Sequence, residues 1–252
     1  MTATGDKHTR AVNCRVGTSG WQYAHWRKIF YPDGLPTACW FEHYAEHFDT
    51  VEINSTFYRM MPEETFRRWR EKAPRGFLYA VKMWRQITHR KKLKDAEREV
   101  TDFLKRAAAL GDRLGPILIQ LPPNLQLDLD RLERFLAVLS GEFQYAMEFR
   151  HASWFSEEVC DLLRKHRVAL CVFHHVSIAC PRVVTAPLIY LRFHGAEGRY
   201  AGKYSSEQLG ERADFVRPYL RKGHRLVAYF NNDHKGHAVE NACEFRALLT
   251  KE

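Results

Sequence analysis

Four side chains that can take part in chemistry stand close together in the middle of the chain. They are a carboxylate, a guanidinium, an imidazole and an indole, at Glu148, Arg150, His151 and Trp154. Residues 144–149 have the composition of a short buried strand. A charge on a buried strand is costly unless it is paired or used, so we expect a functional site where this strand ends.

Proton transfer is the chemistry that these residue types suit best. Lys82 stands near the end of another apolar run, and a carboxylate beside an amine in a partly dry site shifts the pKa of both groups. Glu148 and Lys82 are therefore the expected acid–base pair, with a structural ion pair as the alternative. His194 is the third expected catalytic residue because imidazole titrates near neutrality. The alternative for His194 is a hydrogen bond from its ring to the backbone before Gly195.

Several further residues suit the binding of an anion or of a flat ring. Arg150 and Arg192 can each contact a carboxylate or phosphate through two hydrogen bonds. Gly195 and Gly236 stand where barrel enzymes often bind phosphate. Three aromatic rings could stack on a base or sugar, or could form a hydrophobic lid: Trp21, Tyr58 and Trp154. The remaining expected substrate-binding residues are Asn54, Tyr204, Asn231 and Asn232.

Short apolar runs alternate with amphipathic stretches along the chain. The runs are rich in Val, Ile, Leu and Phe on consecutive residues, which is typical of parallel strands covered on both faces. The expected strands are 13–17, 50–53, 77–83, 116–121, 144–149, 168–173, 188–193 and 225–230. Eight βα units in 252 residues predict an α/β fold, a single (β/α)₈ barrel domain over residues 12–252. An open doubly wound sheet is the alternative, and residues 1–11 are expected to form a disordered tail.

In a barrel of this kind all the strands end on one face, and sites are built there. Polar or aromatic residues stand at every expected strand end: Ser19, Trp21, Glu52, Asn54, Lys82, Gln120, Glu148, Arg150, His174, Arg192, His194, Asn231 and Asn232. Any one of them could be a paired polar group that closes the barrel. The complete ring favours a functional site instead.

No metal or cofactor is expected at this ring. Glu52, Glu148 and several histidines (His174, His194, His234 and His237) could approach one end of the barrel, and such clusters bind zinc in other barrels. Lys82 and Arg192, however, would place positive charge beside the cation. The sequence also has no H-E-x-x-H, no P-loop, no G-x-G-x-x-G and no G-x-S-x-G.

The chain carries a net charge of +9, which indicates either a basic surface or a polyanionic partner. Two basic runs contribute, at 67–70 and 89–94; the first is expected on a solvated helix face and the second in a loop that could contact phosphate. The six cysteines are scattered and are expected to be reduced. Neither a signal peptide nor a membrane span is visible, so a cytoplasmic protein without membrane contacts is expected.

Seven sequence motifs are similar to those of a known family. They are Gly17–Trp21, Phe30–Leu35, Val51–Tyr58, Leu121–Pro123, Glu148–Trp154, Tyr190–Gly195, and Phe230–Asn232 with Asn241 and Ala242. The chain resembles the YecE-like family, also called domain of unknown function 72. The resemblance implies a TIM-type barrel but no settled activity. A distant likeness to the barrels of sugar isomerases and endonuclease IV is an analogy of fold alone.

Two hypotheses follow. The first is an enzyme, a metal-independent hydrolase, lyase or isomerase, which acts by acid–base chemistry on a small phosphorylated sugar or nucleotide-like substrate. The second is a barrel that binds nucleic acid, with DNA repair as the process it would serve, and its binding should weaken steeply with salt. The oligomeric state is left open.

Overall fold

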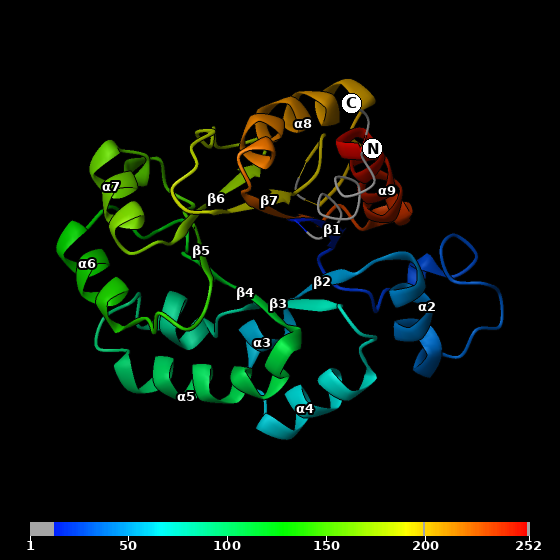
Figure 1. The fold of residues 1–252 in the computed structure, drawn as a ribbon, viewed down its shortest axis with the longest axis horizontal. Helices are drawn as coiled ribbons and strands as arrows, with labels where there is room; N and C mark the ends of the chain where they lie inside the picture. The colour runs from blue at the N-terminus through cyan, green and yellow to red at the C-terminus, as the bar shows by residue number, and fades with distance from the viewer. Residues whose placement is uncertain (1–12, 199, 251–252) are drawn as a thin grey trace, which may run out of the picture.

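The computed structural model describes residues 13–198 and 200–250, and the tail expected at 1–11 lies outside them. Eight parallel strands form a barrel with helices around the outside (Figure 1). The strands are β1 (Cys14–Thr18), β2 (Thr50–Ile53), β3 (Leu78–Lys82), β4 (Leu114–Gln120), β5 (Tyr145–Glu148), β6 (Ala169–His174), β7 (Leu188–Phe193) and β8 (Arg225–Phe230). The predicted single-domain TIM-type barrel is confirmed.

Most strands are followed by a helix that packs on the outside of the barrel. The α-helices are α2 (Trp40–His47), α3 (Ser55–Tyr58), α4 (Glu63–Lys72), α5 (Glu97–Ala107), α6 (Leu129–Val138), α7 (Glu157–Lys165), α8 (Ser206–Arg221) and α9 (His237–Thr250). Short 3₁₀-helices are η1 (Ala24–Trp26), η2 (Thr37–Cys39), η4 (Ala108–Arg113), η5 (Ala152–Trp154) and η6 (His234–Gly236), and η3 (Gln86–Arg90) is a π-helix. The strict alternation of strands with helices fails once, because residues 175–187 join β6 to β7 without a helix.

The barrel closes between its first two strands. The hydrogen-bonded order runs β1-β8-β7-β6-β5-β4-β3-β2, and a parallel bridge between Ser19 and Glu52 joins the two ends. Gly17 makes the close approach possible, because a Cβ there would lie 2.2 Å from the Thr50 carbonyl oxygen. This seam brings Ser19 and Glu52 together directly above the interior of the barrel.

A layer of apolar side chains fills the lower interior of the barrel. The small residues Ala80, Ala146 and Ala169 leave room for two large rings, Tyr190 and Tyr229, whose centroids are 5.4 Å apart. A second and larger apolar cluster lies between the strands and the surrounding helices. The barrel is therefore a packed core rather than a pore, and a site can form only above this layer.

Two further features of the described chain are its cysteines and the length of its apolar helices. All six cysteines lie in the described part of the chain, and all are free thiols. Within residues 13–198 and 200–250, no helix has both the length and the apolar composition that crossing a bilayer requires.

Candidate functional site

Side-chain alternation along the strands places a charged layer directly above the apolar interior. Successive residues of a strand point to opposite faces, so residues two apart share the barrel interior. Four strands follow an apolar interior residue with a polar one: Ala80 with Lys82, Leu118 with Gln120, Ala146 with Glu148, and Tyr190 with Arg192. Each polar residue is at or next to the carboxyl end of its strand, and this end of the barrel is called the mouth below.

Arg192 is the centre of the charged layer. Its guanidinium donates to Glu148 Oε2 at 2.6 Å and to Glu52 Oε1 at 2.7 Å. The side chains of all three residues are buried, with exposed fractions of 1% for Arg192 and 0% for both glutamates. Glu52 also accepts hydrogen bonds from Tyr190, at 2.6 Å, and from Ser19. A buried ion group of this kind is stable only if its partners are all present.

A second group of contacts covers the first on the solvent side. Arg150 pairs through Nε with Glu148 Oε1, and its Nη2 lies 2.6 Å from His194 Nε2. Because a guanidinium can only donate, Nε2 of His194 must be the acceptor in a neutral ring. The proton then sits on Nδ1, and the Asn231 atom 3.3 Å from it is the amide nitrogen Nδ2, which is also a donor and does not accept that proton. The contact with Arg150 is therefore what assigns the tautomer of His194.

The surroundings set the protonation states of this cluster. Burial alone raises the pKa of Glu148, but the guanidinium groups of Arg150 and Arg192 outweigh burial and hold that pKa well below its usual value. Burial, together with the charge of Arg192, lowers the pKa of His194 to about 3. At neutral pH Glu148 is thus a carboxylate and His194 a neutral imidazole, and neither is close to gaining or losing a proton.

Lys82 differs from the other cations of the site, because no carboxylate of the described residues forms an ion pair with it. Its Nζ donates to Gln120 Oε1 at 2.7 Å and lies 4.3 Å from the centre of the Phe57 ring. Arg192 Nη1 shares the same oxygen of Gln120 at 3.4 Å. Burial and, after it, the charge of Arg192 lower the pKa of Lys82 to about 7. Lys82 can therefore gain or lose a proton near neutrality.

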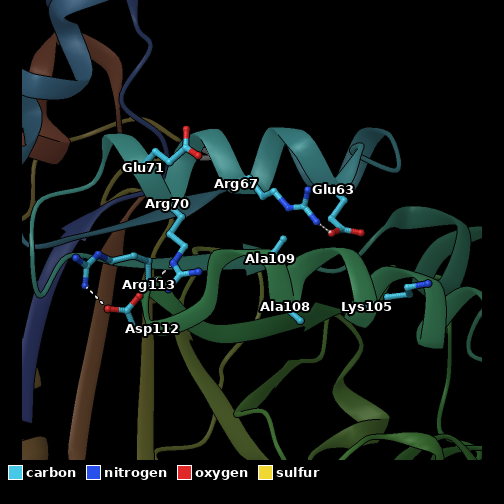
Figure 2. Close-up of a pocket in the computed structure, with 9 residues that line it drawn as sticks. All are labelled: Glu63, Arg67, Arg70, Glu71, Lys105, Ala108, Ala109, Asp112 and Arg113. Carbon is cyan, nitrogen blue, oxygen red and sulfur yellow. Dashed lines mark hydrogen bonds and ion pairs between the residues drawn. The ribbon is translucent and has the colours of Figure 1, made fainter.

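A cleft on another part of the molecule has a different character. It has a volume of about 660 Å³ and lies on the outside of the barrel against α4, α5 and η4 (Figure 2). Five of its seven charged residues are engaged with one another, since Arg67 pairs with Glu63, and Asp112 pairs with both Arg70 and Arg113. Because these exposed pairs neutralise each other, this cleft is a weaker candidate than the mouth.

Comparison with known proteins places this architecture in a family. The family model described as "Protein of unknown function DUF72" matches residues 15–252. The chain belongs to the DUF72 family. A solved DUF72 structure from Thermotoga maritima is 29% identical, with a TM-score of 0.85, and the match covers 94% of this chain and 99% of that one. The resemblance inferred from the sequence motifs is thus confirmed.

Two relatives of this DUF72 chain carry protein names. The Escherichia coli K12 protein named UPF0759 protein YecE is 34% identical over 143 residues, which are 56% of this chain and 50% of the relative. The match thus spans about half the length of that protein. The Bacillus subtilis protein named UPF0759 protein YunF is 23% identical over an alignment that covers 94% of this chain and 95% of the relative. None of these names specifies an activity.

Several residues that the sequence suggested as ligand contacts of this DUF72 protein are buried instead. Trp154 is 1% exposed, stacks on Phe149 and donates to the Leu125 carbonyl, so it has no free ring face for a ligand. Trp21 is 8% exposed and packs edge-on against Phe41. Both rings hold the loops of the mouth in place.

Tyr204, Asn232 and Gly195 also have partners within the protein. The Tyr204 hydroxyl bonds to His174 and accepts from the Gly195 N–H at 3.0 Å, while Asn232 donates to Asn241 at 3.0 Å. Gly195 has a φ of 114°, which explains the choice of glycine there without a phosphate. Tyr58 is 62% exposed, the largest fraction among the described large apolar side chains, and Asn54 donates to Ser19 at 2.8 Å.

The expected pairing of Glu148 with Lys82 is replaced by other contacts. Glu148 forms ion pairs with Arg150 and Arg192, whereas Lys82 donates a hydrogen bond to Gln120. The sequence placed Ser19 and Gln120 at strand ends without a role, and Glu52 was weighed only as a possible metal ligand. The sequence did not single out Tyr190 or Phe57. The two-residue spacing from Tyr190 to Arg192 was the available signal for Tyr190, since both must face the barrel interior.

Strained backbone and exposed apolar side chains gather in the loops that leave the strand ends. Six of the seven described non-glycine residues with positive φ lie there: Lys28, Lys92, Leu93, Asp95, Tyr200 and Lys235. The described large hydrophobic residues that are exposed lie there as well: Ile29, Tyr58, Val176 and Tyr200. The π-helix η3 belongs to the same set of loops. Such strain and exposure concentrate at functional sites more than at purely structural ones.

Proposed function

We propose that this DUF72 protein is an enzyme that acts on a small anionic substrate at the mouth, with Lys82 as the group that moves a proton. The observation that supports this best is the position of Lys82: it is 8% exposed, on an aromatic ring, and without a carboxylate partner among the described residues. An amine in such surroundings changes protonation state at neutral pH, as a general acid or base must.

The charge balance of the mouth supports an anionic substrate. The cationic groups Arg150, Arg192 and protonated Lys82 outnumber the carboxylates of Glu52 and Glu148. His194 is neutral, so it adds neither positive nor negative charge to the mouth. Because the surroundings are buried, the remaining positive charge is poorly screened, and an anion would stabilise it.

Arg150 is the residue best placed to meet that anion. Its side chain is 13% exposed, whereas Arg192 beneath it is 1% exposed and is committed to two carboxylates. Movement of Arg150 towards a substrate would also break its hydrogen bond to His194 Nε2 and leave that nitrogen available. We assign Lys82 as acid or base, Arg150 as the anion contact, and Arg192 and Glu148 as positioning residues.

Pyridoxal phosphate is a suitable probe because it carries both a phosphate and an aldehyde. A neutral amine adds to the aldehyde and loses water to form an imine, and borohydride then adds hydride to make the product permanent. At pH 7 about half of the Lys82 amine is neutral, so mass spectrometry should find Lys82 labelled at least about tenfold faster than the exposed Lys94. Excess inorganic phosphate should slow the labelling of Lys82 but not that of Lys94.

Two variants control this experiment. Lys82→Arg should lose the fast labelling, and Arg150→Met should keep it while losing its sensitivity to phosphate. Equal labelling of Lys82 and Lys94 in the wild-type protein would contradict the role of Lys82. Fast labelling that phosphate does not affect would contradict the anion site but not the role of Lys82.

The loop after β3 favours a second candidate function, the binding of single-stranded nucleic acid at the rim. Residues 83–96 contain one acid, Asp95, and five basic residues, Arg85, Arg90, Lys91, Lys92 and Lys94, of which Lys91 pairs with Glu99. The guanidinium of Arg85 lies 5.9 Å from the centre of the exposed Tyr58 ring. An exposed ring beside basic side chains is the arrangement on which unpaired bases stack.

Fluorescence anisotropy with a labelled single-stranded oligonucleotide tests this candidate. We expect the logarithm of the affinity to fall linearly with that of the salt concentration, with a slope of roughly −0.7 per phosphate contact. The double substitution Lys92→Glu and Lys94→Glu should reduce the affinity more than tenfold. The matched change Arg67→Glu and Arg68→Glu on exposed α4 should not. Equal losses in both variants would indicate non-specific attraction and remove the candidate.

A further inference from the structure

A cluster of metal-ligand side chains lies on α2, outside the site described above. Among the described residues, His43, Glu46 and His47 form the group whose ligand atoms all lie within 4.8 Å of one another. Their spacing of three and four residues places them on one side of the helix. Glu46 and His47 are exposed and His43 is half-buried, so an ion in solution can reach all three.

Hydrogen bonds to the backbone determine which ring nitrogens of the two histidines are available. Nε2 of His43 lies 3.0 Å from the Phe30 carbonyl oxygen, and Nδ1 of His47 lies 2.9 Å from the carbonyl oxygen of His43. A carbonyl can only accept, so each of these nitrogens carries the proton. The lone pairs are therefore on Nδ1 of His43 and Nε2 of His47. Nδ1 of His43 lies 3.9 Å from Glu46 Oε2.

Packing holds the two imidazole rings in place before any ion arrives. Their centroids are 4.6 Å apart, and both rings pack edge-on against Phe30, at 5.0 Å and 5.2 Å. In known metal sites a histidine ligand almost always donates its second ring nitrogen to a carbonyl or carboxylate, which fixes the ring and raises its basicity. Both histidines already have that arrangement here.

We propose that His43, Glu46 and His47 form a binding site for Zn²⁺. Two imidazoles and one carboxylate are the ligand set of open zinc sites, in which water or another donor takes the fourth position. Nitrogen donors disfavour Mg²⁺ and Ca²⁺, which prefer oxygen. The carboxylate of Glu46 must rotate to bring its oxygen closer, which an exposed side chain can do.

Titration calorimetry with zinc chloride and the full-length, untagged protein tests the site. We expect saturable binding of Zn²⁺ that is weakened at least tenfold by His47→Ala and by Glu46→Gln, since losing one of three ligands usually costs this much or more. Both substitutions are at exposed positions, so the fold should be retained. The matched variant His224→Ala should bind Zn²⁺ as the wild type does, and Mg²⁺ should not compete.

Cobalt gives a second measurement on the same variants. Bound Co²⁺ should show the visible absorption of a four-coordinate ion in the wild type, and Zn²⁺ should displace it. The absorption should be lost in His47→Ala. Zinc binding that is unchanged in both His47→Ala and Glu46→Gln would overturn the proposal, as would the absence of saturable binding to the wild type.

Discussion

Replacement of Arg192 by Met is expected to lower the free energy of unfolding by about 3–5 kcal/mol at pH 7.5, because it leaves two buried carboxylates without their shared cation. Arg192 is buried and donates hydrogen bonds to both Glu52 and Glu148. For a domain of this size, such a loss lowers the melting temperature by roughly 10 °C. Urea denaturation followed by circular dichroism measures it.

The pH dependence of this loss identifies its cause. The lowered pKa of Glu148 stabilises the wild type above the pKa that glutamate has in the unfolded chain, and this contribution is lost as the pH falls. Arg192→Met removes one of the two guanidinium groups that lower this pKa, so Glu148 of the variant protonates at higher pH. The difference in stability between wild type and variant should therefore shrink between pH 7.5 and pH 5.

Two further variants make the comparison specific. Arg164 also bonds to two acids, Glu157 and Asp161, but on the surface of α7, so Arg164→Met should leave the stability unchanged. The double variant Arg192→Met with Glu52→Gln should be more stable than Arg192→Met alone, because one buried charge is removed with its partner. A single Arg192→Met variant as stable as the wild type would refute the structural role of the network.

Replacement of Lys82 by Met should have the opposite effect and stabilise the protein at pH 7. The pKa of Lys82 is about 7 in the folded protein and 10.5 in a free side chain. Between these values the unfolded chain binds more protons than the folded one, so the stability of the wild type rises with pH over this range. One pKa unit corresponds to about 1.4 kcal/mol, so we expect a gain of a few kcal/mol at pH 7.

The gain should disappear as the pH approaches 10, where the amine is mostly neutral in both states. Methionine keeps an apolar chain over the Phe57 ring, so the variant does not open a large cavity. Exposed Lys94→Met is the control and should change stability little and equally at both pH values. If Lys82→Met were destabilising at pH 7 and at pH 10 alike, the amine would be a structural group and the proposed catalytic role would fail.

The two substitutions, Arg192→Met and Lys82→Met, are expected to change the free energy of unfolding in opposite directions. Arg192 is paired, so its loss weakens the fold, whereas Lys82 is unpaired, so its loss relieves a burial cost. A charged group that is retained at a cost in stability is a stronger candidate for function than one that stabilises. This contrast is the main reason for assigning the proton transfer to Lys82 and a positioning role to Glu148.

Local pattern in the sequence was enough to determine the strands and the face on which the polar residues gather. Strand formation follows from short runs of β-branched and apolar residues, and a polar group that ends such a run must lie at the strand end. The strands expected at 50–53, 188–193 and 225–230 coincide with β2, β7 and β8. The connection between β6 and β7 departs from the βα alternation that the eight expected units imply, because Pro181 and Pro187 bound a stretch of β-branched residues there.

Only the tertiary structure decided which charged groups pair and which rings are exposed. Arg192 meets Glu52 and Glu148 across 140 and 44 residues of sequence. Pairing of β5, β6 and β7 brings Glu148 to Arg192, and closure of the barrel between β1 and β2 brings Glu52. The same holds for His43, whose available nitrogen depends on the carbonyl of Phe30 in a separate loop. Secondary structure responds to burial periodicity along the chain, whereas ion pairing responds to distance in space, which barrel closure and strand register set after the strands have formed.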